Sequence, residues 1–251
     1  MNQKEKAERF AKLHVKGKPV VLYNAWDAGS AKAIVDSGAK AIATSSWSVA
    51  EAQGYRDGES IPLEFVEQIT ARIAATVELP VTLDFEGGYS EAEGGLANNI
   101  ARLLDLGIIG VNFEDRLVNG KGLYAVDRQA RRIASLRKAA DEKRVALFIN
   151  ARTDVFFQDG DPKQFIDDAL ERAKAYEAAG ASCLFIPGLQ DDALIGRICK
   201  SVSLPVNVMV MDGVPSNKRL AELGVARISY GPIPYIQAMN ALKENAKQVR
   251  S

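Results

Sequence analysis

The sequence predicts an α/β fold and, within that class, one (β/α)8 TIM-type barrel that spans residues 1–251. Eight short apolar runs alternate along the chain with longer amphipathic segments. The runs are rich in Val, Ile and Leu and mostly lack polar alternation, as is typical of parallel strands buried on both faces. Eight such pairs over 251 residues match the number, order and length of this barrel.

The elements follow one another in a regular order. Strands are expected to begin near residues 20, 41, 81, 109, 145, 183, 206 and 226. Helices are expected over 28–36, 62–77, 96–106, 127–140, 162–179, 191–200, 216–223 and 233–249. Pro62 suits the first turn of the second of these helices. Gly38, Gly107, Gly180 and Gly224 each stand where a helix should end.

A doubly wound open sheet is the alternative fold. Such sheets usually have fewer strands and carry a glycine-rich phosphate turn after the first one. The segment after the first expected strand is N-A-W-D-A-G-S, which lacks the G-x-G-x-x-G pattern. No linker or low-complexity segment interrupts the chain, so a single domain is expected.

Composition excludes several classes of protein. The chain has 32 basic and 32 acidic side chains, so it has no long-range field to attract nucleic acid or an anionic membrane. No run approaches the roughly 20 apolar residues of a membrane span. Cys183 and Cys199 form neither a disulfide framework nor a zinc spacing. We therefore expect a cytoplasmic protein, with Cys183 in the core and His14 on the surface of the first helix.

Polar residues gather at the expected C-terminal ends of the strands, where barrels carry their chemistry. In V-T-L-D-F-E-G-G-Y, Asp84 and Glu86 lie two residues apart and so share one side of a strand. With Glu114 they form an oxygen-only set, which favours a hard cation such as Mg²⁺, with Mn²⁺ as the alternative. Arg152 can bind a carboxylate through two nitrogens. The candidate substrate-binding residues are Tyr23, Ser45, Ser46, Trp47, Arg152 and Asn207.

Each of these residues also has a structural explanation. A single acid at a strand end is often a turn residue or a helix cap. Glu114 and Asp115 could pair with Arg116 or Arg152. Ser45 and Ser46 could cap the next segment, and Trp47 could belong to the core. The cluster across several strand ends is stronger support for a site than any member alone.

At these residues the chain resembles the isocitrate lyase / phosphoenolpyruvate mutase superfamily. The matching motifs are S-S-W, G-Y-R-D-G-E-S, D-F-E-G-G-Y, N-F-E-D and I-N-A-R-T-D. The resemblance implies that Asp84 binds Mg²⁺ directly and that Glu86 and Glu114 hold it largely through water. It also implies that Ser45, Ser46 and Arg152 bind a 2-oxo or 2-hydroxy acid, and that Asp57 is an acid near the reacting centre.

The chain departs from the lyases of this superfamily in one loop. They carry K-K-C-G-H after the fourth strand, whereas this chain has E-D-R-L-V-N-G-K-G-L-Y there, without Cys or His. The loop is closer to the mutase and phosphonopyruvate-hydrolase types, and oxaloacetate decarboxylation is also compatible. We expect residues 117–126 to form a lid, with Asn119 and Lys121 as its candidate functional residues. The candidate catalytic residues are Asp57, Lys121 and Arg152.

The expected function is a lyase-type reaction that cleaves or rearranges a C–C or P–C bond through a metal-stabilised enolate. The alternative from another class is a catalytically weak protein that binds a 2-oxo acid. The resemblance also implies a homodimer or homotetramer, in which barrels exchange their eighth helix. Ile236, Met239 and Leu242 form an apolar stripe on that helix, although the stripe could cover its own barrel instead.

Overall fold

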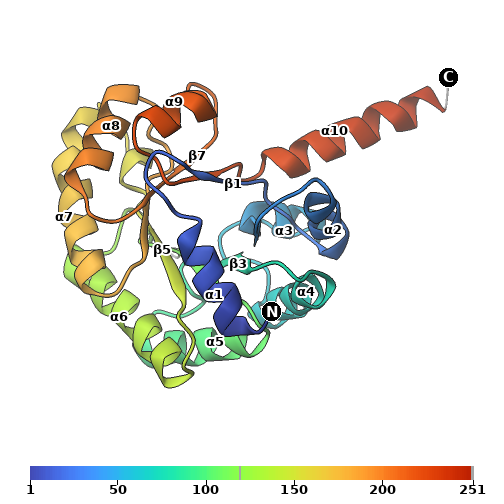
Figure 1. Cartoon of the computed structure of the whole chain (residues 1–251), viewed down its shortest axis with the longest axis horizontal. Coiled ribbons are helices and arrows are strands. Elements are labelled where there is room, and N and C mark those ends of the chain that lie inside the picture. The colour runs from blue at the N-terminus through green and yellow to red at the C-terminus, as the bar shows by residue number, and fades with distance from the viewer. Residues whose placement is uncertain (119, 250–251) are drawn as a thin grey trace.

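The computed structural model describes residues 1–118 and 120–249, and within them eight parallel strands form a nearly closed barrel (Figure 1). The strands are β1 (Val20–Leu22), β2 (Ile42–Ala43), β3 (Val81–Asp84), β4 (Gly110–Glu114), β5 (Phe148–Arg152), β6 (Cys183–Phe185), β7 (Val206–Met209) and β8 (Arg227–Ser229). Hydrogen bonds link them in the order β1-β8-β7-β6-β5-β4-β3-β2. A single parallel bridge, Ala25 to Thr44, joins the two ends of this sheet. The predicted fold class is confirmed.

Helices surround the strands. They are α1 (Gln3–Lys12), α2 (Ala28–Asp36), α3 (Ser46–Ala52), α4 (Leu63–Thr76), α5 (Glu93–Asp105), α6 (Val126–Glu142), α7 (Ile166–Ala178), α8 (Asp192–Ser201), α9 (Asn217–Glu222) and α10 (Ile233–Gln248), with short 3-10 turns η1 (Val155–Phe157) and η2 (Pro162–Phe165). The predicted helical segments correspond to α2 and α4 to α10. In the described ranges, no helix is long and apolar enough to cross a membrane.

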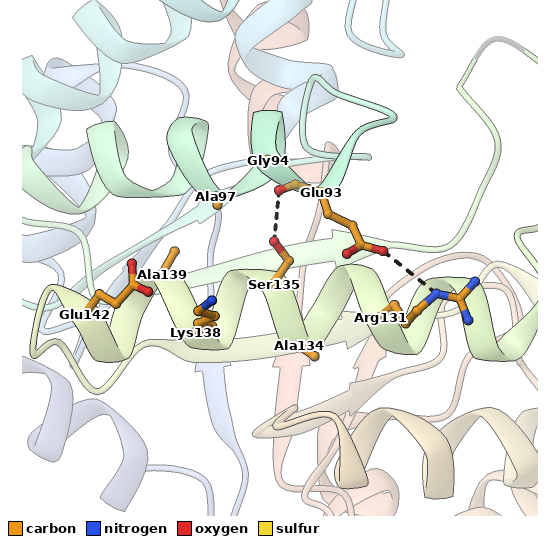
Figure 2. Close-up of a pocket in the computed structure, with 9 residues that line it drawn as sticks. All are labelled: Glu93, Gly94, Ala97, Arg131, Ala134, Ser135, Lys138, Ala139 and Glu142. Carbon is orange, nitrogen blue, oxygen red and sulfur yellow. Dashed lines mark hydrogen bonds and ion pairs between the residues drawn. The ribbon is translucent and has the colours of Figure 1, made fainter.

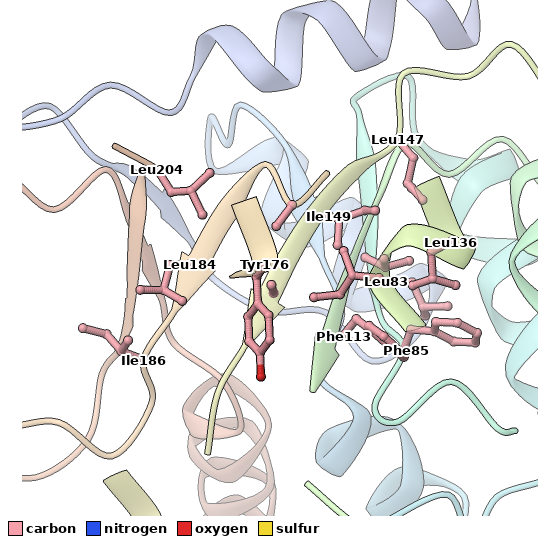
Figure 3. Packing of buried hydrophobic residues seen from close by; sticks show 14 of the residues in the cluster. Leu83, Phe85, Phe113, Leu136, Leu147, Ile149, Tyr176, Leu184, Ile186 and Leu204 are labelled. Atoms are coloured by element: carbon pink, nitrogen blue, oxygen red, sulfur yellow. The ribbon is translucent and has the colours of Figure 1, made fainter. Parts of the chain in front are cut away.

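The main core lies between the outer faces of the strands and the helices. Figure 3 shows Leu83, Ile149 and Leu184 from three strands packed with Leu136 and Tyr176 from α6 and α7. Side chains alternate along a strand, so the residues next to these point into the barrel. The apolar outer faces therefore hold the strands in place, and the inner faces are free to carry polar groups.

Helix α1 closes the N-terminal end of the barrel. Phe10 packs edge-on against Phe148 at the start of β5, with ring centroids 5.1 Å apart. His14 follows the helix and stacks on Phe148 at 4.1 Å, and only 8% of its surface is exposed. The expectation that His14 lies on the surface is wrong, because the chain turns under the barrel where α1 ends.

The burial of His14 predicts a pH dependence of stability. Desolvation, followed by the charge of Arg227, lowers its pKa from 6.5 to about 3. The unfolded chain therefore takes up a proton near pH 6.5 that the folded chain does not bind. The stability that this group contributes is fully present above pH 6.5 and is lost as the pH falls from there towards about 3, by at most about 1.4 kcal/mol per pH unit.

Urea denaturation at pH 7.5 and pH 5.5 tests this prediction. His14 is the only histidine of the chain, so His14→Gln removes the effect without disturbing another imidazole. The wild-type protein should lose about 1.4 kcal/mol more than the variant between the two pH values. Equal losses would mean that the folded state accommodates a charged His14.

Helix α10 leaves the barrel and projects away from it (Figure 1). Ile236 and Leu242 on this helix are 41% and 61% exposed, and Pro234 is its buried residue. The outer face of β1 is correspondingly uncovered, with Val21 44% exposed. The apolar stripe of α10 thus does not cover its own barrel. Exchange of this helix between two copies stays a prediction, and swapping is a low-cost route to a dimer.

Light scattering at micromolar concentration should therefore report a dimer or a tetramer. Leu242→Asp places a charge in the exposed stripe and should shift the mass towards the monomer. Asn240→Asp introduces the same charge at an exposed polar position of α10, so it should leave the assembly intact. A monomeric mass for the wild-type protein would contradict the prediction.

Candidate active site

A cavity of about 170 Å³ opens inside the barrel at the C-terminal ends of the strands. Of the predicted site residues, it is lined by Ser45, Ser46, Trp47, Asp57, Asp84 and Arg152. These residues come from the segment after β2, from the ends of β3 and β5, and from the loop that precedes α4. The structure thus brings together side chains that lie as much as about a hundred residues apart in the sequence.

Asp84 ends β3 and is held on both carboxylate oxygens. Ser46 donates to Oδ2 from its backbone N at 3.0 Å and from its Oγ at 2.9 Å. Asn112 Nδ2 donates to Oδ1 at 3.2 Å. The Oδ1 of Asn112 in turn accepts from Asn150 at 2.8 Å and from Arg227 at 3.1 Å, which fixes the orientation of the amide. Asp84 is therefore positioned without a ligand, and Oδ1 keeps a lone pair for one.

The turn after β3 is hydrogen-bonded to the loop before α4. Glu59 N donates to Glu86 Oε2 at 2.7 Å, Tyr89 N donates to Glu59 Oε1 at 2.7 Å, and Tyr89 Oη donates to Glu86 Oε1 at 3.1 Å. All three residues have a positive φ, of 56°, 51° and 57° for Glu59, Glu86 and Tyr89. Such strain in non-glycine residues persists where surrounding contacts impose it, and it clusters at functional sites. Sequence reasoning missed Glu59, although it lies within the G-Y-R-D-G-E-S motif.

Arg152 ends β5 and binds two acids. Its Nε and Nη2 donate to the two oxygens of Asp154 at 2.6 and 2.8 Å, and Nη1 lies 2.9 Å from Glu114 Oε2. An arginine has five N–H groups, so two remain, one on each terminal nitrogen. These two can donate to the oxygens of a planar carboxylate. Asp115, next to Glu114, belongs instead to a buried pair with Arg172 at 3.0 Å.

Acidic side chains gather in and around the cavity: Asp57 and Asp84 line it, whereas Glu86 and Glu114 lie behind its lining. Burial, then Asp57 and Asp84, raises the pKa of Glu86 from 4.5 to about 8. Burial raises the pKa of Glu114 to about 8 as well, against the charge of Arg152. Asp57 sits exposed at the mouth, yet partial desolvation and Asp84 raise its pKa too. Arg152 is the one cationic side chain among the described residues that line this cavity. An additional cation would therefore be stabilised here.

The oxygen-only donors suit a hard divalent ion, but they do not enclose one. Within residues 1–118 and 120–249, no three His, Cys, Asp or Glu side chains converge to ligate one ion together. Asp84 lines the cavity and is thus the candidate direct ligand, whereas Glu86 and Glu114 do not line it, so their role at the ion through water stays a prediction. Mg²⁺ commonly keeps several waters and one or two protein carboxylates, so the set fits this ion.

Two predicted substrate-binding residues lie away from the cavity. Tyr23 is on the outer face of the barrel, where its Oη donates to Gln237 at 2.5 Å and 40% of its surface is exposed. Alternation along β1 points Leu22 and Asn24 inward, so Tyr23 must point outward. Asn207 faces inward but is fully buried, with its Nδ2 3.2 Å from Ser229 Oγ. Neither side chain lines the cavity.

Lys121 lines a second cleft, of about 750 Å³, on the other side of Arg152. The loop that carries it folds back on itself, since Leu117 N donates to Gly122 O at 3.1 Å. Asn119, the other candidate lid residue, lies outside the described residues. Arg152 and Asp154 also line this cleft, so Lys121 faces a space that borders the predicted site. A lid role for the segment stays a prediction.

Limited proteolysis with trypsin tests the lid. Cleavage after Lys121 should be suppressed when Mg²⁺ and oxalate are added together, because a closed loop is a poor protease substrate. Lys121→Ala removes the cleavage point and identifies the band, and it should lower turnover far more than stability. Equal cleavage rates with and without ligand would show that the loop does not close.

A further groove, of about 460 Å³, lies between α5 and α6 on the outside of the barrel (Figure 2). Ser135 Oγ donates to the backbone oxygen of Glu93 at 2.9 Å, and Arg131 lies 3.8 Å from the Glu93 carboxylate. These bonds join the two helices at the surface. The groove is separated from the strand ends by the helix layer, so we assign it no part in the site.

The chain belongs to the phosphoenolpyruvate phosphomutase family, whose model matches residues 10–250. A crystal structure from Burkholderia cenocepacia J2315, of a protein provisionally described as a phosphonomutase, is 46% identical and has a TM-score of 0.95, covering 98% of this chain and 99% of that one. An uncharacterized protein of Mycobacterium tuberculosis is 32% identical over 242 residues, which are 96% of this chain and 88% of the relative. The predicted superfamily is confirmed.

Two more distant proteins carry assigned activities. An oxaloacetate decarboxylase of Ectopseudomonas mendocina is 31% identical over 196 residues, which are 74% of this chain and 64% of that protein. A phosphonopyruvate hydrolase in complex with oxalate and Mg²⁺ has a TM-score of 0.86 at 20% identity, covering 100% of this chain and 87% of that one. At that identity, the likeness shows a shared fold.

Proposed function

We propose that the chain is a Mg²⁺-dependent lyase-type enzyme, with Mn²⁺ as an alternative ion, that cleaves or rearranges a C–C or P–C bond in a small 2-oxo or 2-hydroxy acid. The observation that carries this proposal is the cavity that Asp57, Asp84 and Arg152 line together. The names of the relatives add support, since oxaloacetate and phosphonopyruvate are both 2-oxo acids.

The residues divide into three roles in this proposal. Asp84 would hold the ion, and Glu86 and Glu114 would bind its waters. The two remaining N–H groups of Arg152 would bind the substrate carboxylate, and Ser45 would border it. A bound Mg²⁺ would supply the positive charge that stabilises an enolate oxygen. Asp57, whose pKa is raised, would hold a proton near the reacting atoms in this proposal.

The cysteines argue against a thiol acid. Cys183 lies inside the barrel beside Arg227, and burial raises its pKa to about 12. Cys199 is buried on α8, and burial raises its pKa to about 11. Neither cysteine is among the described residues that line the cavity. Decarboxylation, hydrolysis or rearrangement is therefore favoured over cleavage that needs a cysteine acid.

A panel assay separates the enzyme from the alternative, a catalytically weak 2-oxo acid-binding protein. Pyruvate release from oxaloacetate, phosphonopyruvate and alkyl-substituted 2-hydroxy acids is followed with Mg²⁺ and with a chelator, and phosphorus NMR of phosphonopyruvate detects a rearrangement, which releases no pyruvate. Asp84→Ala protein, purified identically, corrects for decarboxylation by free metal. We expect chelator-sensitive turnover of at least one acid above this control. Oxalate binding without turnover of any acid would favour the binding protein.

A further inference from the structure

Asp57 reaches the cavity from a loop that is otherwise exposed to solvent. The loop joins α3 to α4, and residues 53–58 are exposed even though Asp57 lines the cavity. Gly58, which follows Asp57, has a positive φ of 87°, a conformation that glycine adopts freely but does not fix by itself. The position of Asp57 therefore depends on contacts with the rest of the barrel. Ser46 hydrogen-bonds its side chain, and the backbone of the loop is held by Glu59, two residues further on.

Glu59 bonds to the turn after β3 through both its backbone and its side chain. Its backbone N donates to Glu86 Oε2 at 2.7 Å, and its Oε1 accepts from Tyr89 N at 2.7 Å. The backbone N–H of Gly87 also donates to the Glu59 carboxylate. Hydrogen bonds from backbone N–H groups to a carboxylate are charge-assisted and therefore stronger than neutral ones. The loop of Asp57 and the turn of Glu86 are thus joined through one residue.

The turn itself has a backbone shape that suits an anion. Glu86, Gly88 and Tyr89 have positive φ values of 51°, 90° and 57°. Turns with such residues can direct successive backbone N–H groups at one anion. Here the anion is the carboxylate of Glu59, which accepts from the N–H groups of Gly87 and Tyr89. The side chain of Glu59 therefore stabilises the strained conformation that carries Glu86.

The same carboxylate lies beside the start of the expected lid. A Cβ at Gly87 would lie 2.7 Å from Val118 Cγ2 and 3.0 Å from Glu59 Oε1. Val118, in the expected lid segment, therefore packs on the backbone next to the Glu59 carboxylate. Three segments meet at this carboxylate: the loop of Asp57, the turn of Glu86 and the first residues of the expected lid.

We propose that Glu59 is a positioning residue, which holds the loop of Asp57 against the turn of Glu86 so that Asp57 stays next to the reacting atoms. This role rests on the function proposed above. Glu59 is not among the described residues that line the cavity, so it acts through Asp57 and not on the substrate. Asp84 and Arg152 are held by other residues, so the binding of the ion and of a carboxylate does not depend on Glu59. Loss of the Glu59 side chain should then lower turnover and leave ligand affinity unchanged.

Three substitutions at Glu59 separate position from charge. Glu59→Ala removes the acceptor of Tyr89 N, and Glu59→Asp keeps the charge but draws it back by one methylene. For both variants, kcat on the best acid of the panel should fall about 10- to 100-fold, because small displacements of a reacting group have effects of this size. Glu59→Gln keeps the length and an oxygen acceptor, so it should restore most of the activity. KM and the affinity for oxalate in Mg²⁺ should stay at the wild-type values in all three. Glu51→Ala, at an exposed acid of α3, is the control.

Trypsin reports the position of the loop without any turnover. Arg56 directly precedes Asp57 in the exposed loop. Proteolysis follows the population of the open form, so release of the loop should speed cleavage after Arg56 severalfold in the Ala and Asp variants of Glu59. The Gln variant and Glu51→Ala should be cleaved at the wild-type rate. If circular dichroism shows that Glu59→Ala does not fold, Glu59→Asp decides the result.

The outcomes separate the role of Glu59 from the proposed function. Unchanged cleavage after Arg56, or unchanged kcat in an active enzyme, would overturn the positioning role. A parallel loss of oxalate affinity would also overturn it, because Glu59 would then support the whole site and not Asp57 in particular. A Gln variant as slow as the Ala variant would show that the charge of Glu59 is used and not its hydrogen bond. If the wild-type protein turns over no acid of the panel, the proposed function fails, and the cleavage rates still decide whether Glu59 holds the loop.

Discussion

Asp84→Ala is expected to abolish the Mg²⁺-dependent binding of oxalate. Asp84 is the candidate direct ligand, and even partners behind a metal ligand commonly contribute about 10- to 100-fold to metal affinity. The loss should therefore be about 100-fold or more. Calorimetric titration of oxalate with Mg²⁺ measures it. Glu78→Ala is the matched control, because this acid is 90% exposed and lies outside the site.

The same substitution should leave the fold intact. It removes the acceptor of Asn112 Nδ2 and of Ser46, and an unsatisfied buried donor costs about 1–3 kcal/mol. It also removes a charge that raises the pKa of Glu86 and Asp57, which relieves repulsion. A circular dichroism spectrum like that of the wild-type protein is expected. Unchanged oxalate affinity in a folded variant would refute the metal assignment.

Arg152→Lys is expected to lower turnover by about 100-fold or more, because loss of one preorganised charge contact at a reacting group has effects of this size. Lysine keeps the charge but lacks the planar fork, so it cannot bind Asp154 through two nitrogens and still present two donors to a carboxylate. The kinetics of the best acid in the panel measure the loss. Arg197→Lys is the control, since Arg197 is 53% exposed and pairs with Asp167 at the surface.

Arg152→Met separates charge from geometry. It leaves Glu114 and Asp154 buried without their partner, and breaking a buried pair on one side costs about 3–5 kcal/mol. We expect the Met variant to be clearly less stable than the Lys variant by urea denaturation. A Lys variant with wild-type turnover would show that the forked geometry of Arg152 is not used.

The barrel was predictable because its signal is local. Each strand and its following helix repeat the same pattern of an apolar run, an amphipathic segment and a closing glycine, as at Gly107 and Gly180. Asp84, Arg152 and Ser46 meet in the cavity because parallel strands place their C-terminal ends together. Knowing that each residue follows a predicted strand was therefore enough to predict that they lie at one end of the barrel.

Other features depend on contacts that the pattern does not contain. The run around Tyr23 has no polar alternation, so nothing in it tells which residues face inward. Glu59 has a positive φ and is hydrogen-bonded to Glu86 and Tyr89, and neither feature can be seen in the sequence pattern. His14 is buried by a turn of the chain under the barrel. The apolar stripe of α10 has the same sequence pattern whether it covers its own barrel or a second copy of the chain.

A crystal structure with Mn²⁺ and oxalate tests the central claim most directly. The anomalous signal of Mn²⁺ locates the ion independently of the protein coordinates. We expect one ion in the cavity beside Asp84, with oxalate between it and the free end of Arg152. An ion bound away from Asp84, or oxalate seated in the cleft beside Lys121 instead, would contradict the account.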